Sequence, residues 1–156
     1  MQNQNKLLIS NNAEYADLIT LHVASVCIPN NDDGVMTYGV VITQYDKEIE
    51  LLSGRKQLKN NRASNICAEY IAMVFGLNYL ITYELQHHPI HIISSIRMCS
   101  NLAEINESSA YAPAAHYLNK IIDDYKLVVS FEWKRRVENQ KSAQLAMNHY
   151  QLIIKG

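Results

Sequence analysis

The chain has 156 residues, a formal net charge of −1 and an apolar content of 48%. This length and composition indicate one globular domain with a sizeable core, because few prolines and glycines interrupt the chain. A charge so close to zero excludes global attraction to a polyanion, which disfavours tight nucleic-acid binding but allows a local basic surface.

Cysteine usage and the amino terminus indicate the cellular compartment. Cys27, Cys67 and Cys99 are odd in number and widely spaced, which favours buried thiols in a reducing cytosol over disulfides or a zinc site. The polar start, MQNQNK, has no signal-peptide core, and we find no run of about 18 apolar residues that would span a bilayer. We therefore expect a soluble, cytoplasmic protein without a membrane partner.

The first predicted element is a strand behind a featureless amino terminus. Residues 1–16 have no clear periodicity, so we expect an N-terminal extension followed by a single domain at 17–156. Leu18–Ile28 is apolar on both faces, which predicts a strand in the centre of a sheet. The turn-forming sequence at 29–34, PNNDDG, ends this strand.

Two further strands form a predicted hairpin. Val35–Thr43 has strand character, and Tyr45-Asp46 is suited to the hairpin tip. Lys47–Leu52 alternates charged and aliphatic residues, which is typical of a strand with one solvated face at the sheet edge. A polar loop is expected at 53–62.

The stretch Ala63–Glu84 is almost continuously apolar and predicts a long core helix, with Ser64 or Asn65 as its N-cap. One carboxylate, Glu69, lies near its start, on the same side as the apolar residues at helical spacing. A buried acid is costly unless it is paired, hydrogen-bonded or bound to a cation. Glu69 is therefore either a metal ligand or a hydrogen-bonded core residue.

Two strands and two helices complete the chain. Their order after the three strands and the core helix gives βββαβαβα, which predicts a mixed sheet with helices on its faces. Ala146, His149 and Ile153 are expected on one side of the last helix. The elements are a strand at Pro89–Ser94, a helix with Pro113 in its first turn, a strand at Leu127–Trp133 and a helix at 139–154.

Three motifs, and their order and spacing along the chain, resemble the ribonuclease H superfamily. Ser64-Asn65-Ile66-Cys67-Ala68-Glu69-Tyr70 resembles the Thr-Asn-Asn-x-x-Glu-Leu signature that opens the first helix of that family. Val26-Cys27, a turn with Asn and Gly, and Tyr38-Gly39-Val40-Val41 resemble its first hairpin. Glu138-Asn139 and Ala143-Gln144-Leu145-Ala146 resemble the start of its last helix. The resemblance covers nearly the whole chain from about residue 18 and implies a ribonuclease H-like α/β fold, a five-stranded mixed sheet with helices on both faces.

The same resemblance implies a carboxylate site that this chain does not complete. In the family, four carboxylates hold two Mg²⁺ ions, which activate water and stabilise the leaving oxygen of a phosphodiester. Glu69 matches the glutamate of the first helix, but Ala24, Ser95 and Ala143 stand at the positions that match the aspartates. Ser94 and Ile96 are further candidates at the end of the fourth strand, and a shift of a few residues would give Ser142 in place of Ala143. We therefore expect a vestigial Glu69 that hydrogen-bonds to His22, Ser94 or Ser95, and no metal or other cofactor.

Other titratable residues offer alternative sites. The remaining acids suit solvated turns and helix faces, although a displaced metal site stays open as an alternative. The histidines of HHPIH suit a junction between a loop and a strand, and His22 suits a hydrogen-bonded core position. The acids are Asp32, Asp33, Glu104, Glu107, Asp123 and Asp124, and the histidines are His87, His88 and His91.

Basic and polar residues flank the core helix and the last helix. In the family that the chain resembles, these regions lie on or near the face that receives a nucleic-acid backbone. Phosphate contacts from such a rim would give weak, salt-sensitive binding, and a solvated surface is the alternative reading. The candidate nucleic-acid-binding residues are Arg62, Ser64, Asn65, Lys134, Arg135, Arg136 and Lys141.

Two functions of different class follow. The first is a catalytically inactive ribonuclease H-like domain that acts as a nucleic-acid-binding or accessory module, with an RNA:DNA hybrid or structured RNA as its ligand. The second is a protein-interaction or oligomerisation scaffold on the same fold, for which the ten tyrosines offer contact surface. A minor alternative is an active, Mg²⁺-dependent endoribonuclease on RNA:DNA hybrid, with relocated metal ligands.

Overall fold

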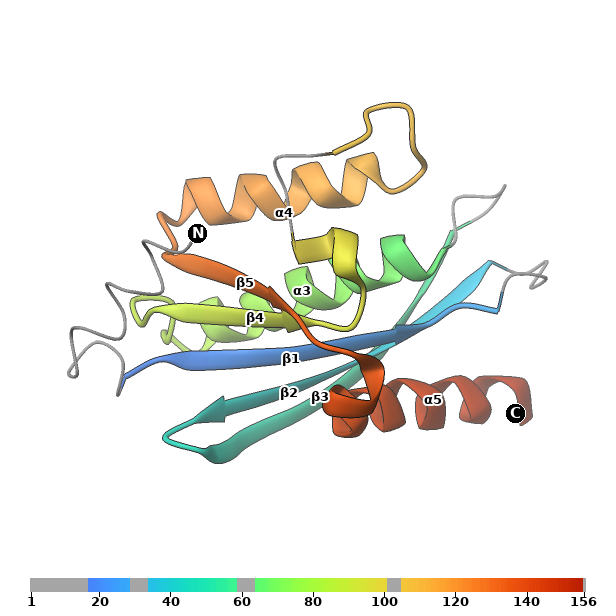
Figure 1. The fold of residues 1–156 in the computed structure, drawn as a ribbon, viewed down its shortest axis with the longest axis horizontal. Coiled ribbons are helices and arrows are strands. Elements are labelled where there is room, and N and C mark those ends of the chain that lie inside the picture. Colours follow the sequence, from blue (N-terminus) through green and yellow to red (C-terminus); the bar gives the residue numbers. More distant parts are fainter. Residues whose placement is uncertain (1–16, 29–33, 59–63, 101–104, 156) are drawn as a thin grey trace.

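The computed structural model describes residues 17–28, 34–58, 64–100 and 105–155 (Figure 1). The predicted N-terminal extension lies outside the described residues, as do four of the candidate site residues. These four are Asp32, Asp33, Arg62 and Glu104.

A five-stranded mixed sheet forms the centre of the domain. β1 (Ile19–Val26) pairs antiparallel with β2 (Val35–Gln44) and parallel with β4 (Ile90–Ser94). β3 (Lys47–Gln57) and β5 (Val129–Trp133) are the two edges, in the order β3-β2-β1-β4-β5. The predicted central position of the first strand and the edge position of the third are both confirmed.

The hairpin between β2 and β3 turns at Tyr45 and Asp46, as predicted. Both residues have positive φ angles, 55° and 58°, which matches the twist of a tight two-residue hairpin. The polar loop predicted at 53–62 is wrong in its first part, because β3 continues to Gln57, opposite Val35. Polar side chains are compatible with this extension because an edge strand leaves them in solvent.

The long core helix α3 (Asn65–Thr82) packs against β1 and β2. Ser64 is its N-cap, and its side chain accepts a hydrogen bond from the backbone N–H of Cys67. By length and mean hydropathy (18 residues, 1.2) α3 could cross a membrane, so the expectation of no such run is wrong on this measure. Half of it is buried inside the domain, as for the core helix of a globular protein.

Two further helices cover opposite faces of the structure (Figure 1). α4 (Ala112–Asp124), with Pro113 in its first turn as predicted, packs against α3. α5 (Gln140–Lys155) follows the short 3₁₀ helix η3 (Arg136–Asn139) and packs against β1 and β2 from the other side. The layers are therefore α4, α3, the sheet and α5.

Small residues and hydrogen bonds hold α5 close to the sheet. Thr37 donates its hydroxyl to the carbonyl of Ala146 at 2.7 Å, and the Asn139 amide donates to the carbonyl of Val23 at 2.7 Å. A Cβ added at Gly39 would lie 2.2 Å from the carbonyl oxygen of Ser142. The buried side of α5 carries Ser142, Ala143, Ala146 and Tyr150, so the predicted side with His149 and Ile153 is rotated from the observed one.

Replacing Gly39 with alanine should therefore destabilise the domain by about 2–3 kcal/mol, because α5 must move away from the sheet. Urea unfolding followed by circular dichroism measures the change. Gly76→Ala is the matched control: its new Cβ would meet flexible methyl groups of Leu21 and Val40, and alanine favours the helix. An equal effect of the two substitutions would contradict this account of α5 packing.

Candidate functional site

The candidate site lies where the parallel strands β1 and β4 end beside the first turns of α3. Val23 of β1 is level with Ser94 of β4, so Ser25 and Ser95 follow at the same edge of the sheet. Glu69, in the second turn of α3, points into this position and has no solvent-exposed surface. The site is thus built from three separate segments around one buried carboxylate.

Both oxygens of Glu69 accept hydrogen bonds. The hydroxyl of Ser25 donates to Oε1 at 2.8 Å. Oε2 accepts from the hydroxyl of Ser94 at 2.6 Å, from the backbone N–H of Ser95 at 2.8 Å and from the Ser95 hydroxyl at 3.0 Å. The expected partners Ser94 and Ser95 are confirmed, and Ser25 is a partner that the sequence interpretation missed.

Burial raises the pKa of Glu69 above its usual value, and the hydrogen bonds from Ser94, Ser25 and Ser95 offset part of that rise. The site can also hold the neutral acid. Ser94 has the carbonyl of Ile96 at 3.2 Å as a second acceptor, and Ser25 has the carbonyl of Asn65 at 3.1 Å. If either hydroxyl turns to its second acceptor, its oxygen can accept the proton of Glu69.

The ligands available here do not fit the two Mg²⁺ ions of the family that the sequence resembles. A pair of dications needs several anionic oxygens, whereas the groups that contact Glu69 are three serine hydroxyls and one backbone N–H. Within the described residues, no group of three or more His, Cys, Asp or Glu side chains could hold a metal ion. The arrangement is that of a hydrogen-bonded core acid.

The other positions matched to family carboxylates lie apart from Glu69. Ala24 is level with Gly39, the residue against which α5 packs, so Ala24 faces α5. Ala143 is buried on α5 itself. Since side chains alternate along a strand, Ser25 shares the α3-facing side with Val23, and this period-two pattern could have identified it.

The expected contact between His22 and Glu69 is wrong. His22 Nε2 lies 3.2 Å from the hydroxyl of Thr43 on β2, because His22 points to the opposite face of β1 from Ser25. Burial lowers the pKa of His22, with the charge of Lys134 as a smaller cause. The prediction of a hydrogen-bonded core histidine fits this position.

The other candidate acids and histidines are dispersed in local pairs. Glu107 lies 2.7 Å from His116, and Asp124 pairs with Lys120 at 3.0 Å. His91 lies between Ser130 and Glu132, at 2.7 and 2.8 Å. The rings of His87 and His88 contact each other, with centroids 4.3 Å apart. The described members of these sets therefore give no support to a displaced metal site.

The predicted nucleic-acid-binding residues fall into two groups. The side-chain oxygen of Asn65 accepts a hydrogen bond from the backbone N–H of Cys27 at 2.8 Å, and the Arg136 guanidinium donates one to the carbonyl of Ser25 at 3.0 Å. Both residues therefore lie beside the end of β1. Lys134 follows β5 and its backbone N–H donates to the Ser94 carbonyl. Lys141 instead forms an ion pair with Glu48 of β3, so its charge is neutralised and it does not join the group at the end of β1.

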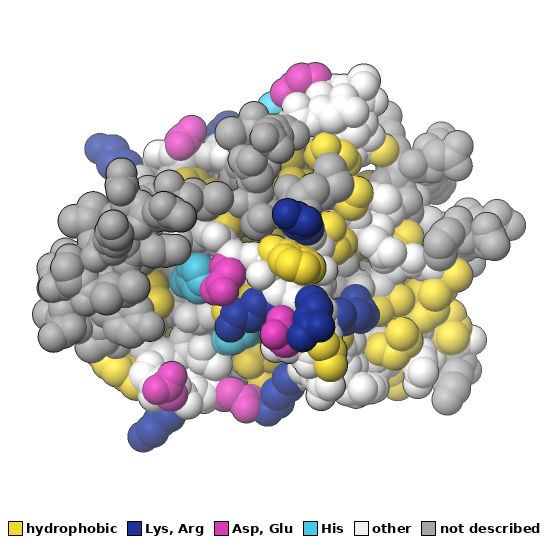
Figure 2. Space-filling model, viewed as in Figure 1, with side chains coloured by type: hydrophobic (Ala, Val, Ile, Leu, Met, Phe, Trp, Pro, Cys, Tyr) yellow, Lys and Arg dark blue, Asp and Glu magenta, His cyan; other side chains and the backbone are white. Residues whose placement is uncertain are grey.

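Three further polar or basic residues complete the description of the region around the ends of β1 and β4. Ser64 uses its side-chain oxygen to cap α3, and Arg135 lies 3.7 Å from Glu138. Arg97 lies 5.7 Å from the ring centroid of Trp133, a pairing that the sequence interpretation missed. Figure 2 shows lysine and arginine side chains gathered near the middle of the face that is drawn, with acidic side chains among them. The positive charge is thus local and partly compensated.

No protein-family model and no curated protein matches this chain. Solved structures do. The N-terminal RNase H domain of a Mycobacterium tuberculosis protein superposes with a TM-score of 0.69 at 12% identity, over 88% of this chain and 98% of that one. The chain has the ribonuclease H fold. The strand order β3-β2-β1-β4-β5 is the order of that fold.

Two other ribonuclease H structures extend the comparison. LC11-RNase H1, whose structure is in complex with an RNA/DNA hybrid, gives a TM-score of 0.65 at 17% identity, over 81% of this chain and 92% of that one. RNase H1 of Halobacterium salinarum gives 0.66 at 14% identity, over 85% and 98%. The shared feature is the fold over nearly the full length of each domain.

The raised pKa of Glu69 predicts a pH-dependent stability. Because the folded state binds the Glu69 proton more tightly than the unfolded state, protonation of Glu69 stabilises the fold. This stabilisation is complete below about pH 4.5, the usual glutamate pKa, and is lost as pH rises through the pKa of Glu69 in the folded state. The free energy of unfolding of the native chain, relative to Glu69→Gln, should therefore fall as pH rises. Urea unfolding of both proteins between about pH 4 and pH 8 measures the difference.

Two further variants, Glu69→Ala and Glu84→Gln, serve as the comparison and the control for this measurement. Gln can accept from Ser95 and donate to Ser25, so Glu69→Gln should cost little stability at neutral pH, whereas Glu69→Ala strands several donors and should cost about 2–4 kcal/mol. Glu84→Gln, at an exposed position beyond α3, controls for loss of a surface charge. A pH-independent difference between the native chain and Glu69→Gln would contradict the raised pKa.

Proposed function

We propose that this domain is a catalytically inactive ribonuclease H-like module that binds nucleic acid, with an RNA:DNA hybrid or structured RNA as its ligand. The observation that carries the proposal is the combination of the fold with the neutral surroundings of Glu69. The fold supports a nucleic-acid-related role, and the serines support the loss of metal-dependent cleavage.

Catalysis in the two-metal scheme needs anionic ligands around both ions. Here the oxygens of Glu69 are already engaged by hydroxyl and N–H donors, and the described residues hold no group of three or more His, Cys, Asp or Glu side chains that could bind a metal ion. Metal binding would have to break these hydrogen bonds and use the anionic form of a carboxyl group, a form that burial disfavours by raising the pKa of Glu69. Both requirements act against a cleavage reaction.

Binding is a separate matter from cleavage, because phosphate contacts need only positive charge and N–H or O–H donors. Lys134, Arg136 and Arg97 lie around the strand ends, close to Ser25, Ser94 and Trp133. Such a small group of cations supports weak binding that depends strongly on salt. Glu138, which lies 3.7 Å from Arg135, compensates part of the positive charge near these strand ends.

A fluorescence anisotropy titration with labelled RNA:DNA hybrid, duplex RNA and single-stranded RNA tests the binding. We expect measurable binding at about 50 mM salt that weakens steeply towards 200 mM. The double substitution Lys134→Gln/Arg136→Gln should weaken binding about tenfold. It should also make the slope of log affinity against log salt concentration shallower, by the amount expected for the loss of roughly two phosphate contacts. Lys47→Gln is the matched control, because Lys47 pairs with Gln44 at the opposite end of the sheet. Absence of binding at low salt would disprove the proposal.

The same substrates test the loss of cleavage. In Mg²⁺ or Mn²⁺, the native chain and Glu69→Gln should give the same background hydrolysis of the hybrid. Cleavage by the native chain that Glu69→Gln abolishes would instead support the active-enzyme alternative.

A protein-interaction scaffold is the second candidate function. The last turn of α5 exposes two large apolar side chains, Leu152 at 73% and Ile154 at 62%. Exposed apolar side chains favour contact with another protein surface. Since α5 and α3 cover opposite faces of the sheet, such a contact would lie on the other side of the sheet from the helix that carries Glu69 (Figure 1).

Size-exclusion chromatography with light scattering tests self-association. If α5 mediates it, the native chain should elute as a dimer at about 100 μM, and Leu152→Ser/Ile154→Ser should shift it towards the monomer. Tyr125→Ser is the control, because Tyr125 is the C-cap residue of α4, the helix layer on the opposite side of the sheet from α5. A native chain that is monomeric at that concentration would remove the homo-oligomer version of this function.

A further inference from the structure

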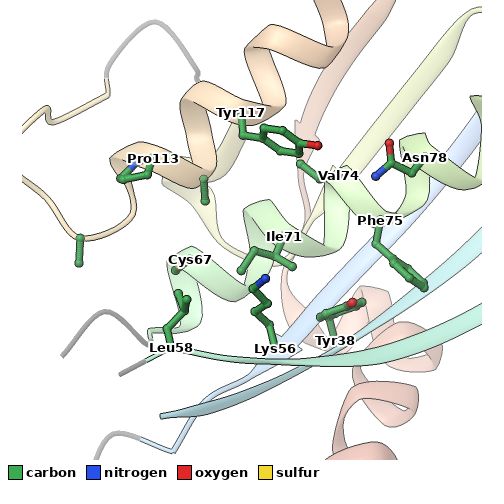
Figure 3. A pocket seen from close by; sticks show the side chains of 12 residues that line it. Tyr38, Lys56, Leu58, Cys67, Ile71, Val74, Phe75, Asn78, Pro113 and Tyr117 are labelled. Atoms are coloured by element: carbon green, nitrogen blue, oxygen red, sulfur yellow. The ribbon is translucent and has the colours of Figure 1, made fainter. Parts of the chain in front are cut away.

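An apolar pocket lies between α3, α4 and the end of β3, and Glu69 is not among its lining residues (Figure 3). Its volume is about 410 Å³, within the range of sites that hold small organic molecules. α3 contributes Ile71, Val74 and Phe75, and α4 contributes Pro113 and Tyr117. The neighbouring β3 end contributes Lys56 and Leu58.

One wall of the pocket is held in place by a glycine. Tyr38 of β2 is level with Gly54 of β3, and a Cβ at Gly54 would lie 2.6 Å from the Tyr38 hydroxyl. The ring of Tyr38 therefore lies across Gly54 and contacts the ring of Phe75, with centroids 5.1 Å apart. This wall is packed by contacts within the protein, so binding would need little rearrangement of Tyr38 or Phe75.

Among the described residues that line the pocket, Lys56 is the one cationic side chain. Lys56 is level with Met36, a core residue on the α3 side of the sheet, so its side chain extends towards α3. Figure 3 shows its ammonium group directed towards Ile71. Within the described residues, no carboxylate oxygen forms an ion pair with Lys56. The charge is therefore available to a ligand.

We propose that this pocket binds a small amphipathic carboxylate, with an aliphatic chain or aromatic ring in the pocket and the carboxylate paired with Lys56. Ile71, Val74, Phe75 and Leu58 supply the apolar contact. Asn78 and Tyr117 add polar groups on the pocket wall. An anion complements the lysine, whereas a neutral ligand of the same shape leaves it in water and a cation is repelled. This ligand is independent of nucleic-acid binding.

An NMR titration of the full chain, uniformly labelled with ¹⁵N, tests the proposal with decanoate as the probe. We expect saturable binding with a dissociation constant on the order of 0.1–1 mM and shift changes centred on Ile71, Phe75 and Tyr117. Decanol and decyltrimethylammonium serve as the neutral and cationic counterparts. Decanoate should bind more tightly than either.

Three variants separate the pocket from nonspecific binding. Lys56→Met should weaken decanoate binding about two- to fivefold, the range of a partly solvated ion pair, without weakening decanol binding. Lys47→Met should change neither ligand. Ala114→Phe, which fills the pocket, should reduce binding of both, with folding verified by the spectrum of the free variant. Shift changes outside the pocket, absence of saturation, or unchanged decanoate affinity in Lys56→Met would overturn the proposal.

Discussion

The buried carboxylate of Glu69 is the constraint on which this end of the domain depends. It joins the second turn of α3 to the ends of β1 and β4 through three serine side chains and one backbone N–H. An acid without these donors would be strongly destabilising in the core. With them, it fixes how α3 lies across the two parallel strands, and each serine is in turn positioned by a strand end.

Fold and chemistry are separable in this molecule because they depend on different residues. The fold needs the apolar stripes, the Ser64 cap and the close contact of α5 with Gly39, all of which are present. Two-metal chemistry needs several carboxylates at one place, and here hydroxyl groups occupy the space around Glu69. A serine is neutral, smaller than aspartate and able to donate, so each serine here stabilises the Glu69 carboxylate instead of repelling it.

Most of the fold could be predicted from the sequence because its signals are local. Apolar runs identified β1 as central, the alternating pattern identified β3 as an edge, and Tyr45-Asp46 identified the hairpin. The end of β3 could not be predicted, since Gly54 and its polar neighbours resemble a loop until Tyr38 is placed across the glycine.

The site was less predictable because it depends on which way each strand residue points. A motif match gave Ala24, while the pleat gives Ser25 as the neighbour of Glu69. His22 failed as a partner for the same reason, as it points to the opposite face. Arg136 was identified only as part of a basic run, and its contact with the Ser25 carbonyl depends on how η3 crosses the strand end.

The composition of α3 follows from its position between two layers. A helix that covers one face of a sheet needs one apolar stripe, whereas α3 has the sheet on one side and α4 on the other. Its apolar residues therefore surround the axis, with Glu69 on the side of the strand ends and Ile71, Val74 and Phe75 on the side of the pocket. The cap at Ser64 and the Asn65 contact with Cys27 hold its first turn. The strand ends and the pocket therefore lie on different sides of the same helix, and each side uses its own set of α3 residues.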